Sequence, residues 1–313
     1  MSAMDDLGEQ WKLWQECLEG EDTNSIFNQV TLLTLDTAIF RLIIEGRHLQ
    51  MERHPDQPKV NLRLHNFVDR TFFQSQVSSI RRLIEPSKLS NLRGPRGVFS
   101  LSALLKDMSS HQPQITREKY FILRKLPYDY QEIIESEKSF SSVQAQRGIS
   151  SYSVPQEYNW EISAETHTLF DQWSGTSRRS PNDVIHEKVF TKLKDKLLSF
   201  KTVTKYVDKY IAHAATPDSR RVENVDKEVI TWKYLWDVHQ SLFEIADYLA
   251  LILSGVGHSP LVWKSPTMFE FWDTPFISTP DMPQLELAWD KYQEEIEEWI
   301  VNGANRVWAY INS

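Results

Sequence analysis

Four long segments carry apolar residues every three or four positions, and this spacing constrains the fold more than any other feature of the chain. They run from about Ser25 to Arg53, Asn61 to Ile84, Pro181 to Ala214 and Asp226 to Leu253. Only 10 glycines and 14 prolines interrupt the 313 residues, which favours a few long helices over many short strands. The sequence therefore predicts an all-α fold, with the long helices packed as an antiparallel bundle.

Residues that start or stop helices support these boundaries. Pro86 follows the second segment, and a proline removes a backbone donor that a helix interior needs. Ser180 and Pro181 together are typical of a helix start, with serine as the N-cap and proline in the first turn. Gly255 and Gly257 are expected to end the last long helix.

Shorter elements are expected around the bundle. An amphipathic helix is predicted from Asp5 to Leu18, and a short helix begins near Ser100, which can cap it. The segment from Ile115 to Gln146 has a helical pattern interrupted by a proline, and a loop is expected from Gly148 to Trp160. An acidic helix is predicted from Leu285 to Ile300.

These elements suggest two parts. Residues 1–255 are expected to form the helical core, with an insertion at about 86–180, and residues 256–313 a C-terminal helical extension. The chain has 11 tryptophans, and those in its last third could pack a lobe or a partner surface; they are Trp232, Trp236, Trp263, Trp272, Trp289, Trp299 and Trp308.

Composition limits location and broad function. The single cysteine, Cys17, cannot form an internal disulfide, so nothing favours a secreted, disulfide-stabilised fold. The N-terminus is acidic and lacks the apolar stretch of a signal peptide. The longest apolar run, Tyr248 to Leu253, is too short to span a membrane. A cytoplasmic protein without membrane contact is expected, and its net charge of −8 argues against indiscriminate nucleic-acid binding over the whole surface.

Common signatures of catalytic and cofactor sites are missing from the sequence. There is no Gly-rich phosphate loop, no paired-histidine zinc helix and no nucleophile elbow. The 9 histidines do not cluster as metal ligands would. No metal and no cofactor is therefore expected.

One segment has the residue types that RNA chemistry needs. Lys205, Lys209 and His213 are spaced four residues apart and share one face of a regular helix. A histidine can act as general acid or base near neutral pH, and lysines can hold a phosphate. Arg220 and Arg221 follow and extend the basic stretch. The alternative is a solvated lysine face with one structural histidine.

Three segments, in this order, resemble the HEPN family of the abortive-infection type U proteins, which are linked to phage resistance. The first is residues 72–84, FFQSQVSSIRRLI, and the second is residues 99–107, FSLSALLKD. The third, Asp208 to His213, looks like the end of the HEPN signature, in which an arginine and a polar residue precede a histidine. The resemblance covers about residues 25–255 in pieces.

The resemblance implies a helical bundle that forms a homodimer across the motif face, with RNA as substrate and an operon-encoded protein as a further partner. In active members arginine and histidine build a metal-independent endoribonuclease. Here that would make His213 the proton-transfer group, with Asp208 at the polar position and Lys209 beside them.

This sequence departs from the signature where the arginine would stand, because Val207 occupies that position and cannot stabilise an anionic transition state. Two interpretations follow. One is a HEPN-type ribonuclease or toxin-like defence protein, and the other is a catalytically degraded module that binds a partner protein or nucleic acid. A purely structural helical protein is a third. Looser Arg-to-His pairs, Arg41/His48, Arg47/His54 and Arg179/His186, arise readily by chance.

Overall fold

The computed structural model describes residues 3–56, 61–84, 92–94, 97–129, 160–212, 215–222 and 229–257, with scattered residues between 267 and 294. Within these residues the regular secondary structure is helical, and Thr116 and Val184 form an isolated antiparallel β-bridge. The predicted all-α class is confirmed. The specifically HEPN-like form of the bundle stays a prediction.

The described helices of the first unit are, in chain order, α1 (Ala3–Glu19), α2 (Ile26–Arg53), α3 (Leu62–Leu83), α4 (Leu101–His111), η1 (Gln112–Gln114), α5 (Arg117–Leu123), α7 (Trp160–Ser174), α8 (Glu187–Leu198), α9 (Lys201–Tyr206), the π turn η3 (Val207–Ile211), α10 (Pro217–Val222) and α11 (Trp232–Ser254).

Local signals set several helix ends as expected. Asn61 and Ser100 accept hydrogen bonds from backbone N–H groups in the first turns of α3 and α4. Gly255 ends α11 with a positive φ of 67°, which glycine adopts without a Cβ clash. Thr231 caps α11, so this helix begins after the expected residue 226.

The helix expected from Pro181 to Ala214 is wrong as one element. Ser180 and Pro181 lie in a turn, and α8 begins after His186, whose ring accepts from the backbone of Lys188. The carbonyl groups of Pro181 and Asp183 instead accept the backbone N–H groups that begin α5. Tertiary hydrogen bonds therefore overrode a local start signal, and a second break separates α8 from α9.

A buried arginine ties α5 to α7 and to the turn before α8. The Arg117 side chain is fully buried, and its guanidinium lies 2.8 Å from a carboxylate oxygen of Asp171 and 3.1 Å from one of Asp183. It also donates to the carbonyl of His167 and lies over the Phe170 ring. Buried charges are tolerated only when paired in this way.

The core is one cluster of buried apolar side chains from α1, α2, α3, α4, α5, α7, α8, α9 and α11. Trp11 and Trp14 of α1 lie in it, and the Trp14 indole donates to Asp107 of α4. Along α11, the predicted apolar face is buried throughout. It consists of Leu235, Val238, Leu242, Ile245, Leu249 and Ile252.

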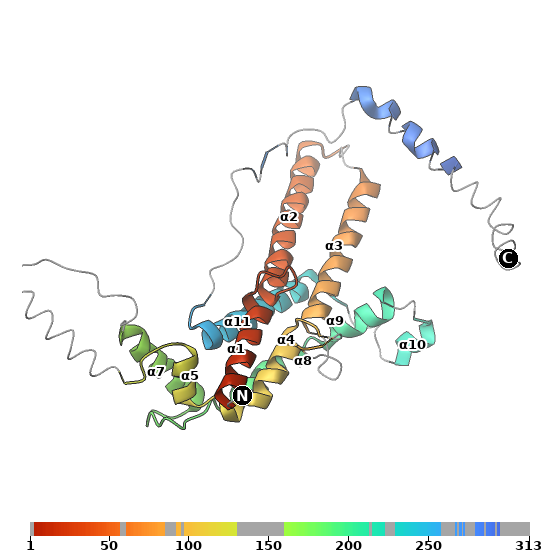
Figure 1. Cartoon of the computed structure of the whole chain (residues 1–313). Coiled ribbons are helices and arrows are strands. Elements are labelled where there is room, and N and C mark those ends of the chain that lie inside the picture. Colours follow the sequence, from red (N-terminus) through yellow and green to blue (C-terminus); the bar gives the residue numbers. More distant parts are fainter. Residues whose placement is uncertain are drawn as a thin grey trace, which may run out of the picture. The chain divides into compact units, whose positions relative to one another are not determined.

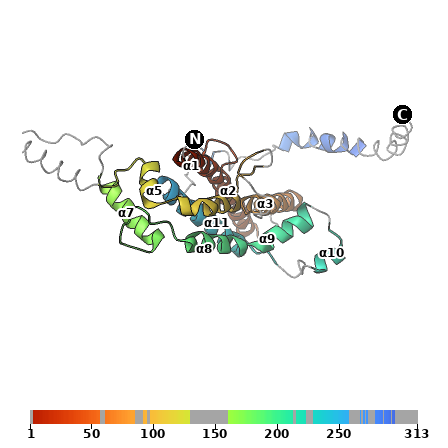
Figure 2. The ribbon, with the colours of Figure 1, turned by 60° about the horizontal axis from the view of Figure 1, so that its bottom comes forward.

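The α2 and α3 helices run side by side, and their distal ends extend beyond the other helices of this unit (Figure 1; Figure 2 shows the pair from another side). Arg47 of α2 forms two hydrogen bonds with Asp69 of α3, at 2.6 and 3.0 Å. Apolar side chains near these distal ends are exposed; they include Leu49, Met51, Leu62, Leu64 and Phe67.

The length and composition of α2 are those of a membrane-spanning helix, because an 18-residue window reaches a mean hydropathy of 1.3. One third of that window is buried inside the protein. A core helix meets the same criteria, so this observation is weak support for a membrane span. Tyr248 to Leu253 remains the longest uninterrupted apolar run, because polar residues interrupt the apolar residues of α2. The cytoplasmic location stays a prediction.

The chain divides into two compact units, Met1–Val262 and Trp263–Ser313. A short helix η5 (Thr279–Asp281) precedes helical residues at 282–284 and 286–291. Trp272 and Trp289 are exposed in this unit. Trp263, Trp299 and Trp308, and the elements predicted over residues 130–159, lie outside the described residues. The insertion expected at about residues 86–180 stays a prediction.

Candidate functional site

The predicted signature segment, Asp208 to His213, begins within the π turn η3. The backbone N–H of Ala212 donates to the carbonyl of Val207 over 2.8 Å, an i→i+5 bond that widens the helix. The regular helix expected for Lys205 and Lys209 is therefore interrupted at Val207, between the two lysines. His213 lies outside the described residues, so its proton-transfer role stays a prediction. π turns are frequent at functional sites.

The charged side chains of this turn have partners in the protein. Asp208 accepts a 2.9 Å hydrogen bond from Nε of Arg81, which comes from α3. Lys209 donates to Ser219 of α10. Arg220 lies over the Tyr210 ring, 5.2 Å from its centroid. The structure thus brings Asp208, Lys209 and Arg220 together, and it adds Arg81, a cation that the sequence pattern did not single out.

Aromatic rings accompany these charges. Tyr206 stacks on Tyr210 with 4.8 Å between ring centroids, and Tyr210 is exposed. Arg221, the last predicted binding residue, is exposed and paired with Asp218 of its own short helix. Exposed rings beside cations can hold an unstacked base and its phosphate.

Val207, at the arginine position of the signature, is buried in the core with 4% of its surface exposed. We expect Val207→Arg to lower the free energy of unfolding by on the order of 3 kcal/mol, because it places an uncompensated charge among apolar groups. Chemical denaturation measures this change. Ala212→Arg is the control, since Ala212 is exposed on the same turn and its change should stay within about 0.5 kcal/mol. Equal stability of the two variants would contradict the assignment of Val207 to the core.

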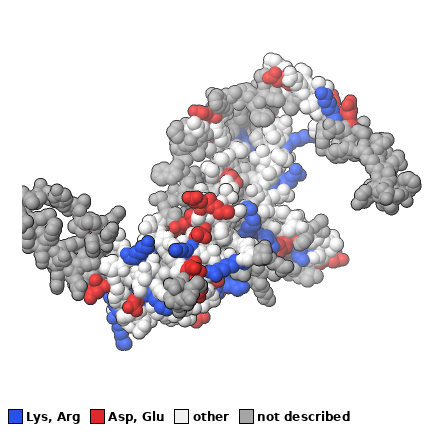
Figure 3. Space-filling view, in the orientation of Figure 1, with Lys and Arg blue, Asp and Glu red and all other residues white. Residues whose placement is uncertain are grey.

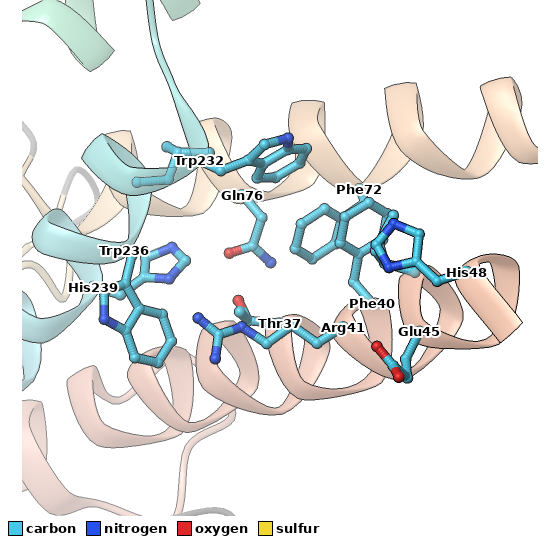
Figure 4. A pocket seen from close by; sticks show the side chains of 12 residues that line it. Thr37, Phe40, Arg41, Glu45, His48, Phe72, Gln76, Trp232, Trp236 and His239 are labelled. Carbon is cyan, nitrogen blue, oxygen red and sulfur yellow. The ribbon is translucent and has the colours of Figure 1, made fainter. Parts of the chain in front are cut away.

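A second site is a pocket of about 400 Å³ between α2, α3 and α11. This volume is in the range of small-molecule sites. Figure 4 shows Gln76 reaching from α3 toward Thr37 and Arg41 of α2, with Trp236 and His239 of α11 beside them.

Aromatic rings form the apolar wall of this pocket. Phe40 and Phe72 stack at 4.0 Å with an interplanar angle of 7°. Trp232 lies 5.2 Å from Phe40 and 5.6 Å from Phe72, tilted by 32° and 27°. The three rings are thus roughly parallel. Trp232 is 53% exposed, so a large indole surface faces outward at the pocket.

The polar floor of the pocket finds no partners among the described residues. Gln76 is fully buried, and neither its amide nitrogen nor its amide oxygen forms a hydrogen bond to the described part of the chain. His239 is 5% exposed, and neither ring nitrogen has a partner there. Leaving a buried polar group unsatisfied costs about 1–3 kcal/mol. A bound molecule, ordered water included, would satisfy these atoms.

Burial, and secondarily the Arg41 guanidinium, lower the pKa of His239 to about 4, so its imidazole is neutral near pH 7. An unfolded histidine has a pKa of about 6.5, so the unfolded state binds the proton more tightly. Stability should therefore fall as the pH decreases from about 6.5 to about 4, by up to about 3 kcal/mol. Urea denaturation across this pH range measures the decrease in stability. The variant His239→Gln should lack the share of this decrease that comes from the histidine. An identical pH dependence in the variant would contradict the shift.

The sequence contained two signals for this pocket. Gln76 is a polar residue next to Val77, within the apolar stripe of α3. Arg41 and His48 form one of the loose Arg-to-His pairs, and both line the pocket with Glu45 between them.

The arginines of the other two loose pairs have different partners. Arg47 donates to the ring of His65 and to Asp69, and Arg179 pairs with Asp171. These contacts lie within the protein, and the chance origin of the two spacings stays a prediction.

Metal-ligand clusters and the cysteine were two further candidates for a reactive site among the described residues. No group of three or more His, Cys, Asp or Glu side chains there is placed to hold a metal ion. Cys17 is buried, and burial with a contribution from Asp107 raises the pKa of its thiol to about 12. Such a thiol is a poor nucleophile.

Comparisons with family models, with curated proteins and with solved structures find no match for this chain.

Proposed function

We propose that this protein binds RNA at the end of α9, as a HEPN-type module. The observation that carries the proposal is the gathering of Arg81, Lys205, Lys209 and Arg220 around one turn that also presents stacked tyrosines. Cations neutralise phosphates, while rings stack on bases. Binding is preferred to catalysis, since Val207 leaves the signature without its arginine.

RNA would bind at this one site and not over an extended surface of the protein. On the face drawn in Figure 3, basic and acidic side chains are interspersed, in keeping with the net charge of −8. Long stretches of duplex need an extended basic surface, whereas a single-stranded segment needs a few cations and stacking platforms. We therefore propose single-stranded RNA.

Salt dependence tests this proposal. Fluorescence anisotropy with a labelled single-stranded RNA should give affinities that fall with salt. Replacing Lys205 and Lys209 together by alanine should weaken binding and flatten the slope by about 0.7 for each phosphate that the variant no longer neutralises. The matched control replaces Lys188 and Lys192 of α8, which changes the net charge equally. If both double variants weakened RNA binding equally, the effect would come from the overall charge, and a site at α9 would be refuted.

RNA cleavage is the second candidate. It is favoured by the ion pair between Arg81 and Asp208, which brings a guanidinium from α3 to the signature segment. Arg81 could supply the charge that Val207 cannot. Purified protein incubated with structured RNA in EDTA tests for metal-independent cleavage.

The homodimer, an operon-encoded partner protein and a role in phage defence or toxicity remain proposals that rest on the resemblance. Exposed apolar side chains on the distal α2 and α3 helices are compatible with a subunit contact. Light scattering at micromolar concentration tests the dimer, and a monomer there would contradict it.

A further inference from the structure

We infer that the pocket between α2, α3 and α11 binds a nucleobase, either as a free nucleotide or as an unstacked base of an RNA strand. This site is separate from the turn at the end of α9 and does not depend on the RNA-binding proposal. Three features of the pocket limit the kinds of ligand that fit it. They are the aromatic wall of Phe40, Phe72 and Trp232, the buried polar floor of Gln76 and His239, and the exposed opening, or mouth, with Arg41, Glu45 and His48.

The wall requires a flat, apolar-faced ligand. Phe40, Phe72 and Trp232 are roughly parallel, and a planar heterocycle can stack against the half-exposed Trp232 indole. A cationic ligand such as a quaternary ammonium is disfavoured. The Arg41 guanidinium already lies over the Trp236 ring, 4.0 Å from its centroid, and would repel a second cation.

The floor requires a ligand whose edge combines donors and acceptors. Gln76 presents an amide N–H and an amide oxygen side by side, both buried and without partners among the described residues. His239, neutral near pH 7, adds one donor and one acceptor. A hydrocarbon or lipid chain would leave all of these atoms unsatisfied. Nucleobase edges carry adjacent donors and acceptors, and glutamine amides pair with them through two hydrogen bonds.

The mouth suits a ribose phosphate. Arg41, Glu45 and His48 are exposed on the same side of α2 and line the pocket (Figure 4). Arg41 can form paired hydrogen bonds to a phosphate, and His48 can donate one. Glu45 would repel a phosphate placed beside it but can accept hydrogen bonds from ribose hydroxyls. The base is therefore expected inside and the sugar at the opening.

Isothermal titration calorimetry tests the inference, with the four nucleoside 5′-monophosphates and ribose 5-phosphate as a control without a base. We expect at least one nucleotide to bind and ribose 5-phosphate not to bind. A short single-stranded oligonucleotide of the preferred base distinguishes the two sources. The comparison uses the variant in which Lys205 and Lys209 are both alanine, so that RNA binding at the α9 turn does not contribute. In this variant, tighter binding of the oligonucleotide identifies an RNA base, and tighter binding of the mononucleotide identifies a free nucleotide.

Two variants locate the binding. Gln76→Leu keeps the volume but removes the amide, and Trp232→Ala removes the stacking surface. Each should weaken nucleotide binding by about tenfold or more. The matched controls are Gln29→Leu, which removes a buried amide that already bonds to Asn24 and Phe99, and Trp289→Ala in the second unit. Neither control should change nucleotide affinity.

Thermal melting separates weaker binding from impaired folding. Gln76→Leu should melt at or above the wild-type temperature, because it removes unsatisfied atoms, whereas Gln29→Leu should melt lower. Variants of Lys205 and Lys209 should bind mononucleotides normally, which distinguishes this site from the α9 turn. The inference is overturned if no nucleotide or oligonucleotide binds, if ribose 5-phosphate binds equally well, or if Gln76→Leu and Trp232→Ala bind normally.

Discussion

Replacing Arg117 with alanine should lower the free energy of unfolding by about 3–5 kcal/mol, the usual cost of removing one partner of a buried ion pair. Its side chain is fully buried, and Asp171 and Asp183 are 17% and 13% exposed. Without the guanidinium these two carboxylates would face each other with little solvent between α7 and the turn before α8. Urea denaturation followed by circular dichroism measures the change.

Two controls separate the effect of charge from that of packing. Arg221→Ala removes an arginine whose ion pair with Asp218 is mostly exposed, so its effect should stay within about 0.5 kcal/mol. A triple variant, Arg117→Met with Asp171→Leu and Asp183→Leu, should recover much of the stability, because apolar groups can replace a buried ionic cluster. If Arg117→Ala matched Arg221→Ala, the buried network would not stabilise this fold.

Replacing His213 with alanine should reduce any RNA cleavage by the protein by about 10²- to 10⁴-fold. His213 is the group of the signature segment that can carry protons near pH 7. Cleavage should not depend on added metal, and a time course with and without EDTA checks this. Lys209→Ala should reduce the rate less, because Lys205 can supply part of the positive charge.

The same assay should include Arg81→Lys. It keeps the positive charge at Asp208 but removes the planar fork that can hold a phosphate at two points. Undiminished cleavage by His213→Ala would remove this histidine from the mechanism. Absence of cleavage in the wild type on several RNAs would leave binding as the function of the α9 turn.

Local sequence determined which segments are helical and where several of them end. Apolar spacing predicted α1, α2, α3 and α11, because a helix that buries one face must repeat every 3.6 residues. Ser100 capped its helix as expected, and Gly255 ended α11 with the left-handed geometry that glycine tolerates. These features depend on neighbours a few positions away, so the sequence contains them directly.

Helix breaks and both candidate sites were decided by contacts between distant residues. The stretch after Pro181 could have been helical, but its carbonyl groups cap α5 and Asp183 pairs with Arg117. The π turn at Val207 was likewise not predicted, because the apolar residues of this segment fit the repeat of a regular helix.

The pocket shows the same limit most clearly. Arg41, Gln76 and His239 each lie on a different helix, and the periodicity of each helix does not show that the three residues meet. They meet because α2, α3 and α11 pack together, and helix packing depends on side-chain shape over many residues. The sequence determined that these helices form, whereas the tertiary structure decided that the polar atoms of Gln76 and His239 would be buried together at one pocket.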